Sequence, residues 1–449
     1  MEDLLSQVAL RAGRYLRGLD GRPVAPSQQA LDGLAVLDEP LPESPTAPEA
    51  VIDLLDRVGS PATMATAGGR FFGFVHGGCL PAALAANWLA GAWDQNAALF
   101  ASSPIASRLE EVAQRWLVEL LDLPEDCGAA FVTGATMASF TCLAAARTAM
   151  LERLGWNVEA DGLFGAPPLT VVISEETHPS VTKALGLLGL GRRRVIRVPV
   201  DHQGRMRAEA FPALGPAAIV CVQAGNVNTG SVDPVGRICE LAHAAGAWVH
   251  VDSAFGLWAK ASPSLAPLVA GVERADSWAT DAHKWLNVPY DSGLAFVRDS
   301  AALGRAMTIA AAYIPKAERR DPGQFTPDLS RRARGVEVWA ALRSLGKAGL
   351  AAMIERTCAH ARRFAGGLRS AGCEILNDVV LNQVLVSFGD GETTLRVVDR
   401  IQQEGTCWCG ATTWQGRTAM RISVASWATT AEDVERSLEA MIRAWREVC

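Results

Sequence analysis

Several features that would point to a membrane, a nucleic acid or a secretory route are missing from this sequence of 449 residues. No uncharged apolar run reaches the roughly 18 to 20 residues that a membrane-spanning helix requires. The first residues, Met1 to Leu5, do not combine a basic segment with a continuous apolar stretch, so we expect no signal peptide. The net charge of −6 disfavours nucleic acids and anionic membranes as partners.

A zinc-binding pattern is also missing, although the chain has ten cysteines. Cys407 and Cys409 are closer than the usual Cys-x-x-Cys ligand pair, and no histidine cluster accompanies them. We therefore expect no bound metal. Free thiols are typical of a reducing compartment, and we expect a soluble, cytoplasmic protein.

The composition is that of a globular enzyme with a large core, at 49% hydrophobic and 20% charged residues. The length suits two or three domains. We predict an N-terminal helical segment over residues 1–69, a large domain over 70–345 and a small domain over 346–449. Apolar residues at helical spacing over 1–20 predict an amphipathic helix, whose apolar face can pack on a partner subunit or on its own domain.

Short apolar runs alternate with helical patterns through the predicted large domain. The predicted strands are 129–133, 169–173, 195–198, 218–222, 248–251 and 293–297, with helices at 137–154, 181–190 and 235–244. This alternation predicts an α/β fold, with a mainly parallel sheet and helices on both of its faces. A helical stretch over 336–368 with interruptions near Gly346 and Gly349, strands at 384–388 and 420–424 and a helix at 431–448 predict a smaller C-terminal α+β domain.

An acid and a lysine stand at the ends of two strands. Asp252 closes the apolar run 248–251, and Lys284 follows His283 further along the chain. Taken alone, Asp252 reads as a capping acid and Lys284 as a surface residue. Together they match the way an enzyme holds pyridoxal 5'-phosphate (PLP). The carboxylate keeps the pyridine nitrogen protonated, and the lysine amine forms the Schiff base through which amino acids enter.

The cofactor phosphate needs hydrogen-bond donors and positive potential. Strand 129–133 runs into the small residues Gly134, Ala135 and Thr136, which open a predicted helix. Free backbone N–H groups at a helix start, together with the Thr136 hydroxyl, form an anion site. His283 can add a hydrogen bond to the phosphate. Such a turn also caps many helices that bind no anion.

The ring of the cofactor has its own candidates. The imidazole of His178 can stack on the pyridine ring opposite Asp252 and Ala254 and take part in proton transfer; a helix-capping histidine is the structural alternative. Ala254 is small enough for a ring to lie against it. Asn226 and Asn228 can reach the ring hydroxyl, or they can simply form a turn.

These motifs are similar to those of a known family. Residues 131–147, 174–183, 250–254 and 277–285 resemble four blocks of the group II PLP-dependent amino acid decarboxylases, which include the aromatic amino acid and glutamate decarboxylases. The resemblance extends from about residue 70 to the C-terminus. It implies the type I fold of PLP enzymes, a homodimer with shared active sites, and removal of the α-carboxylate from an L-amino acid. An aldehyde synthase, an aminotransferase and a PLP-binding protein without catalysis are the alternatives.

The resemblance also implies where the substrate lies. Residues 93–104 match a stretch that walls the substrate side chain, and Arg421 matches an arginine that can meet a substrate carboxylate or pair with acids of the protein. The candidate wall is apolar and aromatic, which favours an aromatic or bulky apolar substrate over glutamate. The candidate substrate-binding residues are His76, Trp93, Asn96, Phe100 and Arg421.

One departure from the family concerns a loop over about residues 316–330. Animal and plant members carry a tyrosine there that protonates the carbanion after carbon dioxide leaves, and its loss accompanies oxidative, aldehyde-forming chemistry. The three tyrosines of this chain, Tyr15, Tyr290 and Tyr313, all lie elsewhere, and Phe325 is near the expected place. His178 or Tyr313 is an alternative proton donor.

Overall fold

The computed structural model describes residues 1–215, 217–309 and 319–449. Its contacts group into two units, which are described separately below. The first comprises Met1–Gly78, His360–Leu376 and Val384–Cys449, and the second Cys79–Ala359 and Asn377–Gln383. The three-part division at residues 69 and 345 stays a prediction. Tyr313 and residues 316–318 of the loop lie outside the described residues.

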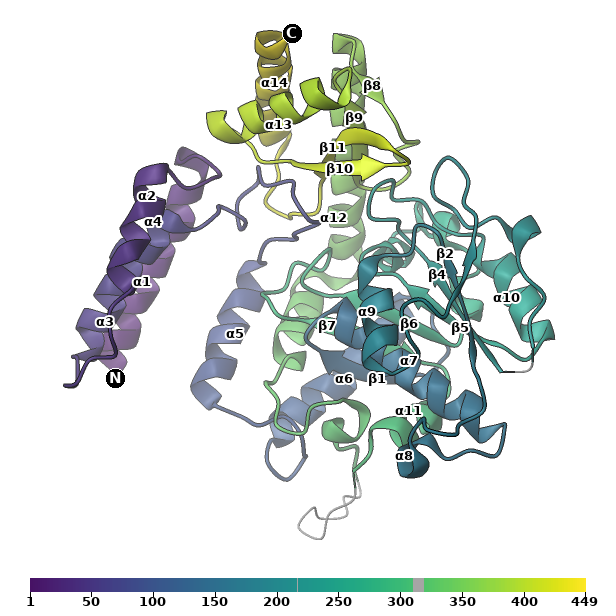
Figure 1. Cartoon of the computed structure of the whole chain (residues 1–449). Coiled ribbons are helices and arrows are strands. Elements are labelled where there is room, and N and C mark those ends of the chain that lie inside the picture. The colour runs from purple at the N-terminus through teal and green to yellow at the C-terminus, as the bar shows by residue number, and fades with distance from the viewer. Residues whose placement is uncertain (216, 310–318) are drawn as a thin grey trace. The chain divides into compact units, whose positions relative to one another are not determined.

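The second unit is built on a seven-stranded sheet, counted over the described residues, with the order β1-β7-β6-β5-β4-β2-β3 (Figure 1). Its strands are β1 (Gly128–Val132), β2 (Thr170–Ser174), β3 (Ile196–Val198), β4 (Ala218–Gln223), β5 (Trp248–Asp252), β6 (Ser277–Asp281) and β7 (Gly293–Val297). Strand β7 is antiparallel to both neighbours, and the pairs among β6, β5, β4, β2 and β3 are parallel. The predicted mainly parallel sheet is confirmed.

Helices of the second unit connect these strands and pack on them. They are α5 (Pro81–Trp93), α6 (Pro104–Leu120), α7 (Ala135–Glu152), α8 (Val158–Asp161), α9 (Pro179–Leu187), α10 (Val235–Ala244) and α11 (Ser300–Met307). Helix α7 contacts β1, β4, β5, β6 and β7 as well as α9 and α11, while α10 packs on β4 and β5. Small residues such as Ala138 and Ala145 are fully buried, which lets α7 lie close to the sheet.

Strand β6 is a strand that the sequence analysis missed. Its sequence, Ser-Trp-Ala-Thr-Asp, has too many polar residues to read as a buried strand, yet all five residues are buried. The Ser277 hydroxyl lies 2.9 Å from Trp248 Nε1 and 3.0 Å from His250 Nδ1 on the neighbouring strand β5. Burial is tolerated because these partners satisfy the hydroxyl.

The first unit contains a four-stranded sheet with the order β10-β11-β9-β8. Its elements are α1 (Glu2–Gly18), α2 (Gln28–Asp32), α3 (Pro48–Leu54), α4 (Ser60–Ala62), β8 (Glu374–Ile375), β9 (Gln383–Ser387), α13 (Gly391–Glu404), β10 (Gly410–Trp414), β11 (Arg417–Ser423) and α14 (Ala431–Val448). Thr430 and Asp433 form a capping box at the start of α14. The predicted C-terminal strands and helix are confirmed within three residues, and β8 and β10 were not predicted.

The N-terminal helix α1 is amphipathic as predicted, but none of its residues is buried. Arg11 Nη1 lies 3.1 Å from both Asp53 Oδ1 and Asp56 Oδ2, and these ion pairs connect α1 to α3 and to the turn that follows it. Leu5 and Leu10 are exposed. Part of the apolar face of α1 is therefore exposed, although Val8 and Tyr15 of the same helix are half-buried.

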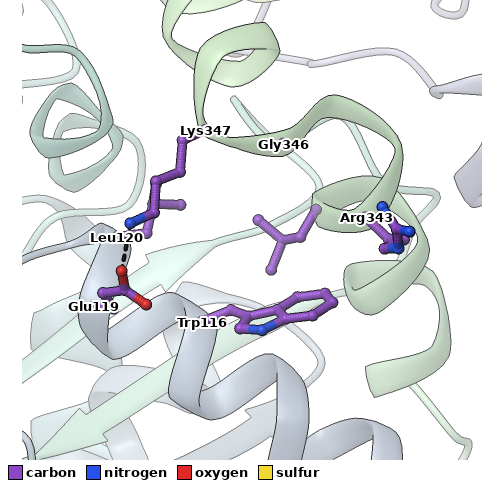
Figure 2. A pocket seen from close by; sticks show the side chains of 7 residues that line it. Trp116, Glu119, Leu120, Arg343, Gly346 and Lys347 are labelled. Carbon is purple, nitrogen blue, oxygen red and sulfur yellow. Dashed lines mark hydrogen bonds and ion pairs between the residues drawn. The ribbon is translucent and has the colours of Figure 1, made fainter.

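Helix α12 (Gly335–Ala371) is broken at Gly346, which has the non-helical angles φ 59° and ψ −179°. The predicted interruption there is confirmed, whereas the helix continues through Gly349. Glycine suits this break because other residues rarely adopt such angles. Figure 2 shows the pocket of about 260 Å³ beside it, where α12 faces α6. Its lining residues are Trp116, Glu119, Leu120, Leu342, Arg343, Gly346 and Lys347.

Three further observations concern membrane-spanning helices, metal sites and disulfides. Over the three described ranges, every helix is too short or too polar to cross a bilayer. Those residues also contain no group of three or more His, Cys, Asp and Glu side chains arranged to hold a metal ion. All ten cysteines are free thiols; Cys79 is half-buried, Cys449 is exposed and the others are buried.

Candidate active site

Two carboxylates are brought to one edge of the larger sheet. Asp252 ends β5 and Asp281 ends β6, and the two strands are paired in parallel with Asp252 opposite Ala279. In open α/β sheets, ligands bind outside the carboxyl ends of such strands. Lys284 follows three residues after Asp281, so the turn after β6 presents it at this same edge.

Lys284 is held by an ion pair within this turn. Its Nζ lies 3.1 Å from Asp281 Oδ2, and its side chain is 18% exposed. His283 Nε2 lies 3.4 Å from the other oxygen of the same carboxylate, Asp281 Oδ1. The backbone N–H of Ser292 donates to His283 Nδ1 at 3.1 Å, so the proton of the neutral imidazole is on Nε2 and faces Asp281. Burial lowers the pKa of His283 despite the nearby carboxylate, which favours this neutral form.

Asp252 is buried among charged groups. Burial raises the pKa of its carboxyl above the ordinary value, and the charges of His178 and Lys284 oppose that rise. The negative charge of Asp281 raises the same pKa further. His178, Lys284 and Asp281 therefore all act electrostatically on the carboxyl group of Asp252.

His178 caps helix α9. Its Nδ1 accepts a hydrogen bond from the backbone N–H of Ser180 at 3.2 Å and lies 2.7 Å from the Ser180 hydroxyl. This is the structural alternative considered for the residue, and it also fixes the ring. Because Nδ1 accepts, the neutral ring carries its proton on Nε2.

The turn after β1 lies beside the end of β6. Val132 and Asp281 both pair with Gly293 of β7, so the ends of β1 and β6 flank the same residue. A Cβ atom at Gly293 would lie 2.4 Å from the Cα of Gly134, so only glycine allows this approach. Helix α7 begins at Ala135, whose backbone N–H donates to Asp281 Oδ1 at 2.6 Å.

Comparison with known proteins identifies the family. The model of the pyridoxal-dependent decarboxylase conserved domain matches residues 32–389. The chain belongs to the pyridoxal-dependent decarboxylase family. The predicted family, the PLP cofactor and the class of PLP-dependent carboxy-lyase are thereby confirmed.

Two curated decarboxylases illustrate the similarity in sequence. The chain is 28% identical to tryptophan decarboxylase 1 of Oryza sativa subsp. japonica, over 92% of this chain and 87% of that protein. It is 27% identical to the aromatic-L-amino-acid decarboxylase of Bacillus atrophaeus, over 71% and 67%. Among solved structures, the Oryza sativa enzyme with PLP and tryptamine has a TM-score of 0.91 at 24% identity, covering 99% of this chain and 97% of that one. Mouse CSAD has a TM-score of 0.88 at 23% identity, over 97% and 98%. These likenesses confirm the type I fold.

The described residues of this decarboxylase fit PLP at the edge of the sheet. Three buried polar groups there have no hydrogen-bond partner among the described residues, namely the amide nitrogens of Gln223 and Asn226 and the hydroxyl of Thr177. Gln223 lies opposite Asp252 in the pairing of β4 with β5. Buried polar groups are costly without partners, and a cofactor with a ring hydroxyl and a phosphate can supply them.

The other predicted cofactor residues lie in the turns around this edge. The Asn226 side-chain oxygen accepts from the backbone N–H groups of Asn228 and Thr229, at 2.9 and 3.2 Å, whereas its amide nitrogen has no partner among the described residues. The Ala254 carbonyl accepts from the N–H of Asp281 at 2.9 Å. Thr136 lies half-buried in the first turn of α7.

The predicted substrate residues of the second unit have structural contacts of their own. The Asn96 side-chain oxygen accepts from the backbone N–H groups of Ala98 and Arg331, at 3.2 and 3.1 Å. The backbone N–H of Phe100 donates to Asp321 Oδ1 at 2.8 Å. Trp93 ends α5 and is 40% exposed. Asn96 therefore orders its own loop, and contact of these three with a substrate remains a prediction.

The remaining two substrate residues belong to the first unit. His76 stacks on Phe71 with ring centroids 5.2 Å apart, and Phe71 in turn stacks on Trp408 at 5.0 Å. Arg421 lies in β11 opposite Gly410, and burial lowers its pKa. Their roles toward a substrate stay predictions.

Two residues at the site escaped the sequence analysis. Asp281 was seen only as part of the lysine motif, although an acid at a strand end three residues before Lys284 is the same signal that identified Asp252. Tyr290 stacks on His283 with ring centroids 4.3 Å apart and is 53% exposed. No pattern in the sequence indicates that Tyr290 lies there, because that depends on the turn between β6 and β7.

Proposed function

We propose that this PLP-dependent decarboxylase acts on an aromatic L-amino acid and releases the amine and carbon dioxide. The observation that carries this proposal is the cluster of Lys284, Asp252 and His178 at the carboxyl edge of the sheet, where burial and mutual charge set the pKa of Asp252. PLP, when bound, supplies the electron sink for the bond that breaks. The protein has to bind the substrate, orient its carboxylate and deliver a proton to Cα.

Each residue of the cluster has a distinct proposed role. Lys284 would hold the cofactor covalently through its side-chain amine. Asp252 holds the proton on the pyridine nitrogen, which requires its carboxylate to be charged next to a cation. His178, whose ring is fixed by Ser180, presents Nε2–H toward the site as a hydrogen-bond donor or acid.

The aromatic substrate is supported by the named relatives, by aromatic residues of the predicted substrate wall and by Tyr290, which stacks on His283. Tryptophan, tyrosine and aromatic-L-amino-acid decarboxylases are among the similar proteins. In this chain, Trp93, Phe100 and Tyr290 supply aromatic side chains. Such a lining favours apolar side chains over the carboxylate of glutamate.

A screen of the twenty L-amino acids with identification of each product tests the proposal. We expect the highest kcat/KM for an aromatic amino acid, with the corresponding amine as the product. Equal or better turnover of glutamate would contradict the aromatic assignment. A keto acid that appears only with an amino-group acceptor would indicate an aminotransferase, and binding of PLP without any turnover would indicate a non-catalytic protein.

An aldehyde synthase is the second candidate, because the loop lacks a tyrosine. Phe325, nearest the expected place, packs against the core cluster around α7 and α11, and the Arg320 guanidinium lies 4.3 Å from its ring centre. Tyr290, by contrast, stacks on His283. Without an acid that delivers a proton to Cα, oxygen would be reduced to hydrogen peroxide and water would release the nitrogen as ammonia, so the product would be an aldehyde in place of the amine.

We therefore expect measurable oxygen uptake alongside carbon dioxide release. A positioned acid contributes about 10²- to 10⁴-fold to a proton transfer, so its loss should alter the ratio of amine to aldehyde. An oxygen electrode combined with product chromatography measures this ratio. Phe325→Tyr should shift the products toward the amine. Production of the amine alone, with no oxygen uptake, would reject the oxidative side reaction. It would indicate that another acid, such as His178 or Tyr290, delivers the proton.

A homodimer is the proposed assembly. The exposed apolar side chains support it, because they include Leu5 and Leu10 of α1 and Trp88 and Leu89 of α5. Large exposed apolar residues on neighbouring turns of a helix favour burial in a subunit interface. The ten free thiols support a reducing, cytoplasmic location.

A further inference from the structure

The carboxylate of Asp281 lies where the cofactor phosphate is expected to bind. Its Oδ1 accepts from the N–H of Ala135, the first residue of helix α7, at 2.6 Å. The same oxygen is 3.4 Å from His283 Nε2, and Oδ2 is 3.1 Å from Lys284 Nζ. Ala135 and His283 are the groups that the sequence analysis assigned to the phosphate.

The close approach of the turn at Gly134 to the end of β6 restricts the position of the Asp281 side chain. Gly293 separates Asp281 from Val132 in the strand register, and its missing side chain brings the turn at Gly134 against the end of β6. A Cβ atom at Gly134 would lie 3.3 Å from Asp281 Oδ1 and 3.2 Å from His283 Cε1. Asp281 itself is buried.

A phosphate and a carboxylate at this point compete for the same donors. Free N–H groups at a helix start and the positive end of the helix dipole stabilise one anion well. A second anion within about 4 Å is repelled, and the repulsion is stronger in a buried site than in water. Binding of the phosphate therefore requires the Asp281 carboxylate to give up the Ala135 N–H.

We propose that Asp281 is a positioning residue that competes with the cofactor phosphate for the start of helix α7 and thereby weakens the affinity for PLP. This inference rests on the proposed phosphate site. It goes beyond the chemistry of decarboxylation, because it concerns how readily the enzyme loads and loses its cofactor. The same carboxylate contacts both Lys284, the proposed cofactor lysine, and the start of α7, the proposed phosphate site.

The test compares two ligands that differ only in the phosphate. Asp281→Asn removes the charge and keeps the shape. We expect the Kd of the apoprotein for PLP, measured by absorbance and tryptophan fluorescence, to fall about tenfold or more. The Kd for pyridoxal, which has no phosphate, should stay within about twofold of the wild-type value. Inorganic phosphate should compete with PLP at lower concentration in the variant.

Asp126→Asn is the matched control, because this aspartate is exposed in the turn before β1. It should leave both Kd values unchanged. If Asp281→Asn fails to fold, Asp281→Ser removes the same charge and should give the same selective gain. An unchanged or weaker affinity for PLP, or an equal gain for pyridoxal, would overturn the proposal. Neither result would affect the proposed function, since substrate turnover does not enter the measurement.

Discussion

Lys284→Ala is expected to abolish turnover. The Lys284 amine is the group that we propose to hold the cofactor, and an alanine side chain cannot replace this amine. With PLP bound, borohydride reduction should attach the cofactor irreversibly to the peptide that contains Lys284. Peptide mass spectrometry after proteolysis, together with a carbon dioxide assay, measures both effects.

Lys183→Ala is the control, because this lysine is exposed on α9. It should retain normal kcat and the normal reduced peptide. Lys260 is an unsuitable carrier, since its Nζ is already paired with Asp122 at 3.0 Å and Glu273 at 2.8 Å. A reduced peptide that contains Lys183, Lys260 or Lys347 would refute the assignment of the active site.

Asp252→Asn should lower kcat by orders of magnitude with a smaller change in KM. The charge of Asp252 would keep the pyridine nitrogen of bound PLP protonated, and a protonated ring is the better electron acceptor. Loss of this charge is therefore expected to raise the barrier of the bond-breaking step more than it weakens substrate binding. Loss of a preorganised electrostatic partner costs about 3 to 6 kcal/mol, which is roughly 10²- to 10⁴-fold in rate. Steady-state kinetics at saturating PLP measures the effect.

The surroundings of Asp252 provide a further check on this role. Burial raises its pKa, and the electrostatic effects of His178 and Lys284 counteract that rise, so a cation next to the carboxylate favours the charged form. Circular dichroism should show that the variant remains folded. A folded variant with near-normal kcat would mean that Asp252 only supports the structure.

The sequence predicted most of the large sheet because its strands are apolar and buried. Strands β1, β4, β5 and β7 are buried along their whole length and were predicted within one residue at each end. Strand β6 was missed because Ser277, Thr280 and Asp281 are polar. Their burial depends on partners such as Trp248 and His250, which come from another part of the chain.

The sequence by itself predicted the family and the PLP cofactor, which the family match confirmed, and it proposed Asp252 and Lys284 as the residues that anchor PLP. These two residues could be proposed because a strand end places a charged residue at a ligand-binding edge, and that is a local property of the chain. The resemblance in four blocks supplied the reaction, and the family match confirmed it.

Only the tertiary structure decided what these side chains contact. Asp281 contacts the start of α7 because β7 lies between β1 and β6 and is antiparallel to both. The last residues of β1 and β6, which are far apart in the sequence, therefore both pair with Gly293. Asn96 accepts a hydrogen bond from the backbone of its own loop, and the buried hydroxyl of Ser139 lies 3.3 Å from His250 Nε2 on β5. Strand order and register set these contacts, and neither can be read from local patterns of apolar and polar residues.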